Sequence, residues 1–449
     1  SSDVCSSDLV TATDGGKLSK SEVFTFTVQN GDAPVNIDGY LKGALVYRDL
    51  NNDGQWNHDP ITSVTVTEAN GVYALVINGG AFKATEPWGI TDQFGKSPFI
   101  GGGTASLRTE AWTYGGKING GTADLVTVDI STQREWAGSY AAPARSGVIN
   151  PISTMVASAA AELGNDVAAA VTRVKTVLAL PAGITDLLNF DPLAEATKAT
   201  DFDSAKRAME VQGKALQVAN LLRIVAEVAD AAGVANASQV AQAVARSLVS
   251  NNAAFDLGSA TAISSVVSGL KTFVSADAAK GIDAAAESVS KALAFVNTSI
   301  GNSVQAAINA ATTGGVGDLA KLDIGGALSE AVQAQIVAQE FVAGAASKAV
   351  TSAIATGGSA AAVAALLSDI SGLAAGNAAA LTQAAVRARA AVGTVFVSSA
   401  DTKAANAIDD NAYVLAERVG TTAAASGNVS GDRKSTRLNS SHVSESRMP

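Results

Sequence analysis

The chain has very few of the residues on which much enzyme chemistry depends. Its 449 residues include one cysteine, Cys5, and two histidines, His58 and His442. A disulfide framework needs paired cysteines, and a hydrolytic triad needs a histidine beside its nucleophile, so neither is expected. The sequence also lacks the G-x-x-x-x-G-K-[ST] pattern of a phosphate-binding loop. We therefore expect a protein that is not an enzyme.

Basic residues are also scarce. The 31 lysines and arginines are outnumbered by 41 acidic residues, which gives a net charge of −10. A chain without basic clusters cannot neutralise phosphates, so nucleic-acid binding is not expected. The uncharged stretch 349–368 is long enough to span a bilayer, but it is mostly alanine and contains Thr-Gly-Gly-Ser. We expect no membrane span.

Oxygen-bearing side chains are concentrated in residues 49–59, which read D-L-N-N-D-G-Q-W-N-H-D. Their alternation before Gly54, which supplies a sharp turn, is typical of a calcium loop. The twelfth position, where an EF-hand carries a bidentate Glu, is Pro60. A plain Asx-rich turn is the alternative, since Asn, Asp and Gly cluster in turns without a metal. The predicted calcium ligands are Asp49, Asn51, Asp53, Gln55, Asn57 and Asp59.

The flanks of this loop do not favour an EF-hand. Residues 41–47 and 61–67 are rich in β-branched and aromatic residues, so we expect two strands there. His58 is interpreted as a solvated loop residue, because a hard cation prefers oxygen to imidazole. Asp409 and Asp410 are interpreted as a solvated turn, because nothing apolar surrounds them to raise a pKa.

Residues 36–145 are rich in turns and in β-forming residues, with glycine pairs between short segments such as 125–130. This pattern predicts a small antiparallel β-sandwich module. Three tryptophans, Trp88, Trp112 and Trp136, follow the acidic loop. Large aromatics carry much of the buried area of a small sandwich, so we expect them in its core rather than on a ligand platform.

Beyond Pro151 the composition changes to Ala, Val, Ser and Leu, which predicts an alanine-rich helical array over 146–400. One long helix is expected to begin at Asp203 or Ser204 and to end at Gly233. Its apolar stripe has steps of three and four: Ala208, Val211, Ala215, Val218, Leu222, Val225 and Ala229. Further helices are expected at 151–163, 166–180, 238–249, 260–274, 283–296, 303–311, 328–355, 359–373 and 378–392.

Several segments resemble bacterial surface proteins. Residues 38–54 (DGYLKGALVYRDLNNDG) and 67–75 (TEANGVYAL) are similar to B-type repeats of adhesins and to carboxypeptidase regulatory-like domains. Residues 10–35 resemble the last hairpin of a cadherin-like domain, and 401–431 the start of another such repeat. Residues 148–156 (VINPISTMV) are similar to the segment that follows such β modules in large surface proteins. The resemblance implies an extracellular structural module.

Both ends of the chain resemble translated sequencing adapters. Residues 1–9 read S-S-D-V-C-S-S-D-L, and residues 432–449 read D-R-K-S-T-R-L-N-S-S-H-V-S-E-S-R-M-P. We expect neither to contribute to the fold, and we treat 10–431 as an internal fragment of a longer reading frame. Excluding both ends leaves the net charge at −10 and His58 as the one histidine.

These observations predict a multidomain chain with β structure first and helices after it. The predicted divisions are 1–9, 10–35, 36–145, 146–400, 401–431 and 432–449. The expected function is a structural or adhesive segment of a secreted or surface-attached bacterial protein. Calcium would stabilise its β module, and its surface ligand would be a protein or a carbohydrate. The alternative is a set of accessory modules of a secreted carbohydrate-active enzyme or protease whose catalytic domain lies elsewhere.

Overall fold

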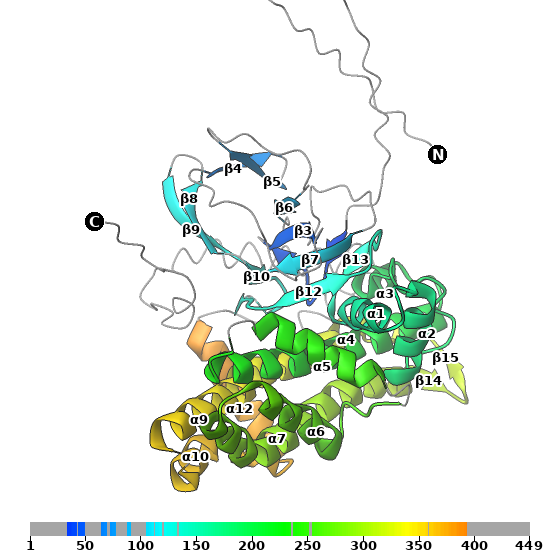
Figure 1. Ribbon diagram of the computed structural model, residues 1–449. Coiled ribbons are helices and arrows are strands. Elements are labelled where there is room, and N and C mark those ends of the chain that lie inside the picture. Colours follow the sequence, from blue (N-terminus) through cyan, green and yellow to red (C-terminus); the bar gives the residue numbers. More distant parts are fainter. Residues whose placement is uncertain are drawn as a thin grey trace, which may run out of the picture.

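The computed structural model describes residues 34–42, 44–49, 64–69, 72–77, 88–90, 105–111, 113–118, 121–132, 134–234, 237–250, 254–357 and 359–392. Strands come first along this part of the chain, helices follow, and the helices predominate. The strands that precede the helices in sequence gather on one side of them (Figure 1). The predicted β-then-α order is therefore confirmed.

The strands form small sheets. A four-stranded sheet has the order β12-β7-β3-β6, a second has the order β5-β4-β8-β9, and a three-stranded sheet has the order β11-β10-β2. The strands of these three sheets are β2 (Leu41–Lys42), β3 (Leu45–Asp49), β4 (Val64–Ala69), β5 (Val72–Ile77), β6 (Trp88–Ile90), β7 (Ser106–Glu110), β8 (Thr113–Ile118), β9 (Gly121–Val126), β10 (Val128–Asp129), β11 (Arg134–Glu135) and β12 (Ser139–Ala142).

Two strand pairs are parallel, whereas the sequence predicted an antiparallel module. Strand β4 pairs with β8, and β1 (Val35–Asn36) pairs with β13 (Val148–Ile149). The second pair joins the first described strand to the last strand before the helices. The chain therefore enters and leaves the β part at neighbouring positions. Parallel pairing of this kind needs a long connection, which the intervening strands supply.

The helices are α1 (Pro151–Glu162), α2 (Val167–Val177), α3 (Pro192–Lys198), α4 (Phe202–Ala231), α5 (Ala237–Ser250), α6 (Ala260–Gly269), α7 (Ala276–Ala310), α8 (Ile324–Val337), α9 (Ala343–Thr356), α10 (Ala360–Leu367), α11 (Ser371–Ala374) and α12 (Ala378–Val392). Three 3₁₀ segments lie at Leu270–Phe273, Leu319–Lys321 and Ser368–Ile370. A π-helical turn, Ala338–Val342, joins α8 to α9 without a break. No single described helix is long and apolar enough to cross a membrane, but the bent pair Ala361–Ala374 and Ala378–Arg387 passes that test by length and composition.

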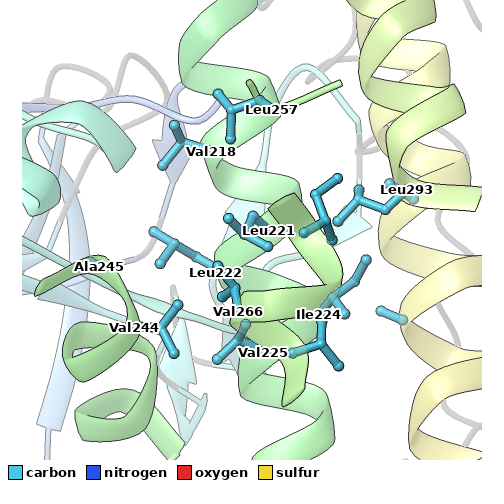
Figure 2. Close-up of a cluster of buried hydrophobic side chains, with 14 of the residues drawn as sticks. Val218, Leu221, Leu222, Ile224, Val225, Val244, Ala245, Leu257, Val266 and Leu293 are labelled. Atoms are coloured by element: carbon cyan, nitrogen blue, oxygen red, sulfur yellow. The ribbon is translucent and has the colours of Figure 1, made fainter. Parts of the chain in front are cut away.

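Helix α4 is the centre of the helical part. All seven residues of its predicted stripe are buried, so the predicted periodicity is confirmed. The prediction of a single stripe is wrong, because Leu216, Leu221 and Ile224, which lie outside it, are also buried. Figure 2 shows side chains of α4 packed among those of α5, α6 and α7. A helix surrounded by other elements is apolar over most of its circumference.

The core continues from the helices into the β part. One cluster of buried side chains includes Val46 of β3, Leu107 of β7 and Tyr140 of β12, together with Ile152 of α1 and Leu216 of α4. The predicted division at 145/146 therefore crosses a shared core. Burying apolar area across this division stabilises both parts at about 25 cal/mol per Å².

Several helix boundaries differ from those predicted. Helices were expected at 283–296 and 303–311, but α7 runs through both. The expected helix 328–355 contains the π-helical turn. Between α7 and α8, β14 (Thr312–Thr313) and β15 (Val316–Gly317) form a hairpin. Helix α4 is capped by Asp201, whose side chain accepts a hydrogen bond from the Ser204 N–H, two residues before the predicted start.

Candidate functional site

The predicted calcium loop begins at the end of strand β3. Asp49 is the last residue of that strand, and β4 follows the loop, so the expected strand flanks are confirmed. The two strands belong to different sheets, and the loop therefore connects one sheet to the other. Asn51, Asp53, Gln55, Asn57 and Asp59 lie outside the described residues, as do His58, Asp409 and Asp410.

The one predicted ligand that the structure describes is in an ion pair. The Asp49 carboxylate is buried and accepts a hydrogen bond from Nε of Arg108, on β7, at 2.5 Å. The Nη1 atom of Arg108 is buried and has no hydrogen-bond partner. No group of three or more Asp, Glu, His or Cys within the described ranges could hold a metal ion. Calcium at the loop stays a prediction.

The most elaborate polar site in the described part surrounds Asp38, in the turn between β1 and β2. The Asp38 side chain is 1% exposed and accepts three side-chain hydrogen bonds. Its Oδ2 accepts from the Trp136 Nε1–H at 3.2 Å and from the Tyr140 hydroxyl at 2.9 Å. Its Oδ1 accepts from the Gln335 Nε2–H of α8 at 2.7 Å. Helix α4 reaches the same residue, because Gln212 Nε2 donates to the Asp38 backbone oxygen at 3.1 Å.

Burial decides the protonation of this carboxyl group. Desolvation raises the pKa of Asp38 to about 7, and the nearby carboxyl group of Asp129 adds to the rise. The donors Tyr140, Gln335 and Trp136 lower the pKa but do not cancel the desolvation. Burial also raises the pKa of the Tyr140 hydroxyl, and the Asp38 carboxyl group raises it further. The site thus contains a carboxyl group that changes charge near neutral pH.

Asp129, on strand β10, is the second buried acid at this site. Its Oδ1 accepts hydrogen bonds from the Ser131 N–H and hydroxyl, both at 2.8 Å. Its Oδ2 is buried without a partner, and burial raises its pKa. Gly39 allows the close approach of the two turns, because a Cβ at this position would overlap the side chain of Ser131. A larger residue at position 39 would displace Ser131 and the Asp129 carboxyl group that it contacts.

The π-helical turn lies next to this site. Gln335 belongs to the last turn of α8, and Glu340 within the π-helical turn pairs with Arg134 of β11 at 2.5 Å. π-Helical turns frequently occur at functional positions, because the extra residue redirects the side chains around it. Here Gln335 and Glu340 both contact the β part. The turn therefore marks the place where α8 is attached to the β part.

A second attachment joins the β part to helix α3. The Tyr40 hydroxyl donates to Oδ2 of Asp191 at 3.1 Å, and Asp191 caps α3 by accepting from the N–H groups of Leu193 and Ala194, both at 3.0 Å. Tyr40 is 1% exposed and has a φ of 42°, a left-handed conformation that bulky residues rarely adopt. Its burial against Ile37, Ile130 and other apolar side chains compensates for this conformation.

A surface pocket of about 290 Å³ lies between α4 and α7. Glu210 and Lys214 of α4 line it, and desolvation raises the pKa of the first and lowers that of the second. Gln217 lines the pocket and donates to the backbone oxygen of Asn297 at 2.6 Å. The pocket presents both signs of charge. The described part of the chain contains no histidine or cysteine.

Asp38 has no predicted role, although the segment that resembles surface-protein modules begins at this residue. The local signal is the Asp-Gly-Tyr tripeptide before a strand, but the hydrogen-bond donors to Asp38 follow 98 or more residues later.

Comparisons with known protein families, with curated proteins and with solved structures found no match.

Proposed function

We propose that this chain is a structural and adhesive segment of a bacterial extracellular or surface-attached protein, in which calcium rigidifies the β part. The resemblances of residues 38–54, 67–75 and 148–156 to surface-protein modules support this function. The strands on both sides of the acidic loop support a calcium site between two sheets. Its ligand would be a protein or a carbohydrate.

The single observation that carries the structural role is the use of the polar side chains in segment 148–156. Asn150 caps α1 by accepting from the Ser153 N–H at 2.7 Å, and the Ser153 hydroxyl accepts in return from the Asn150 N–H at 2.8 Å. This reciprocal arrangement is a capping box. Pro151 occupies the first helical position, where its missing N–H is not needed.

The same segment also fastens α1 to strand β12. The hydroxyls of Ser153 and Thr154 both donate to the backbone oxygen of Ala141, at 2.8 and 3.3 Å. In addition, the Ala141 N–H donates to the Thr154 hydroxyl at 2.9 Å. Ser153 and Thr154 thus join strand β12 to α1, while Asn150 caps the helix.

Adhesion is tested by immobilising the whole chain on beads. The beads are presented to arrays of matrix proteins and of glycans, with albumin-coated beads as the control. We expect calcium-dependent retention on at least one immobilised class, and loss of retention in a chelator. Retention on no surface, with or without calcium, would contradict the adhesive role.

The contiguous genomic sequence separates this function from the alternative of accessory modules in a secreted enzyme. We expect further β modules, or repeats similar to residues 36–145, in the same reading frame. A catalytic domain in that frame would support the alternative instead. This comparison does not depend on the calcium site or on the adhesion assay.

A further inference from the structure

The contacts of Asp38 join three separate parts of the fold. Its carboxyl group is held by Trp136 and Tyr140 from the β part and by Gln335 from α8, and its backbone oxygen is held by Gln212 from α4. All of these groups are buried. A change in the charge of Asp38 therefore acts directly on the attachment of the β part to the helices.

The side chains around Asp38 fit both of its protonation states. The Asp38 carboxyl group accepts from three donors in the structure. Oε1 of Gln335 is buried without a hydrogen-bond partner. Turning the Gln335 amide by 180° would place this oxygen against Oδ1 of Asp38, where it accepts the proton of the neutral carboxyl group. Trp136 and Tyr140 continue to donate to Oδ2 in that state.

The charged groups at the site do not compensate an ionised Asp38. Asp129, from β10, is the buried ionisable group that repels it, while α4 and α8 present the uncharged amides Gln212 and Gln335. Glu340 of the π-helical turn and Arg134 of β11 are paired with each other. Burying a charge without an opposite charge is costly.

We propose that Asp38 and Gln335 form a proton-dependent latch between the β part and helix α8, closed when Asp38 is protonated and loosened when it ionises. Rising pH removes the protons of the two buried carboxyl groups, Asp38 and Asp129, to solvent and leaves two carboxylates in one site. Their repulsion weakens the attachment of α8 at the π-helical turn. Acidic conditions close the latch.

The direction of the pH effect follows from the shift of the Asp38 pKa. The folded value is about 7, whereas an unfolded aspartate titrates at about 3.9. The folded state therefore holds the proton more tightly than the unfolded state. The resulting stabilisation is complete at pH values below the pKa of the unfolded aspartate. It is lost as pH rises toward and through the pKa of Asp38 in the folded state. Through this window the folding equilibrium constant falls by up to about tenfold per pH unit.

The indole of Trp136 provides a local measurement, because its N–H donates to Asp38. The chain has 4 tryptophans, so few indole signals appear in a ¹H–¹⁵N spectrum, and Trp136→Phe identifies the relevant one. We expect this signal to titrate near pH 7 in the wild-type chain. It should not titrate in Asp38→Asn, which keeps an acceptor and a donor but cannot ionise. Asp369→Asn, at an exposed position, makes the same change in charge and should leave the titration intact.

Two further measurements test the latch itself. Gln335→Met removes a donor to the carboxylate and should move the Trp136 titration to higher pH. Backbone amides of α8 should exchange faster in wild type than in Asp38→Asn at pH 8 and equally at pH 5. A Trp136 signal that is constant from pH 5 to 9 would overturn the proposal. Equal exchange of α8 in the two proteins at both pH values would also overturn it.

Discussion

The close approach of α7 and α9 at Gly281 can be tested by adding one methyl group. A Cβ at Gly281 would lie 2.6 Å from Cβ of Ala353 and 3.1 Å from Cα of Val350. Neither atom is the end of a flexible side chain, so the two helices must separate. Gly344 of α9 is the matched control, because it is buried in a helix but has no atom within 4 Å of an added Cβ.

The expected magnitudes follow from two effects. Replacing glycine by alanine within a helix stabilises it by about 0.8–1.0 kcal/mol, so Gly344→Ala should raise the free energy of unfolding by about that amount. Gly281→Ala gains the same helix propensity but adds overpacking, which costs about 1–3 kcal/mol. The propensity contributions cancel between the two variants. Gly281→Ala should therefore be less stable than Gly344→Ala by about 1–3 kcal/mol.

Urea unfolding, followed by far-ultraviolet circular dichroism, measures both variants. The midpoint should fall for Gly281→Ala relative to Gly344→Ala, while the slope of free energy against urea stays the same. A changed slope would indicate a different unfolded or native ensemble rather than a local clash. Equal stabilisation by the two substitutions would refute the close packing of α7 against α9.

Further predictions concern the calcium loop and the cap of helix α3. Calcium titrated to ~100 times its dissociation constant, expected at ~10⁻⁴ to 10⁻³ M, should stabilise the chain by about 2.7 kcal/mol. Asp53→Asn should reduce this calcium-dependent stabilisation. It tests the site better than Asp49→Ala, because Asp49→Ala also leaves Arg108 buried without its partner. An unchanged stabilisation in calorimetry would contradict calcium binding at this loop. Asp191→Ala should cost about 0.5–2 kcal/mol through the lost cap, and Tyr40→Phe about 0.5–1.5 kcal/mol through the lost hydrogen bond. The double variant should lose less free energy of unfolding than the sum of the losses of the two single variants. Additive losses in urea unfolding would show that the contact between Tyr40 and Asp191 contributes nothing.

The sequence predicts the helical part well where local signals agree. Asn150 and Pro151 mark the start of α1, and the expected helix 378–392 coincides with α12. Within α7 the local signals conflict, because Asn297 and Gly301 interrupt the apolar pattern between the expected helices 283–296 and 303–311. In the structure Asn297 is buried, and its amide donates to the backbone oxygen of Leu257 at 2.9 Å. Tertiary contacts of this kind hold a helix together where local preference does not.

The site around Asp38 could not be predicted from the sequence, for a related reason. Hydrophobic periodicity identifies which face of an element is buried, but it does not show which distant polar residues meet. Gln335 lies 297 residues after Asp38, on a helix predicted only from its alanine-rich pattern. The acidic loop is recognisable because its oxygen-bearing side chains are close in sequence. The clustering of Asp38, Trp136, Tyr140 and Gln335 depends on the packing of the strands against α4 and α8.

The shared core and the contacts of Asp38 predict that the β part and the helices unfold as one cooperative unit. The chain offers a direct test, because its four tryptophans all precede the helices: Trp56, Trp88, Trp112 and Trp136. Tryptophan fluorescence therefore reports the β part, while far-ultraviolet circular dichroism reports mainly the helices. In equilibrium urea unfolding near pH 5 we expect the two transitions to coincide in midpoint and slope. A fluorescence transition at clearly lower urea than the loss of helix would contradict the claim.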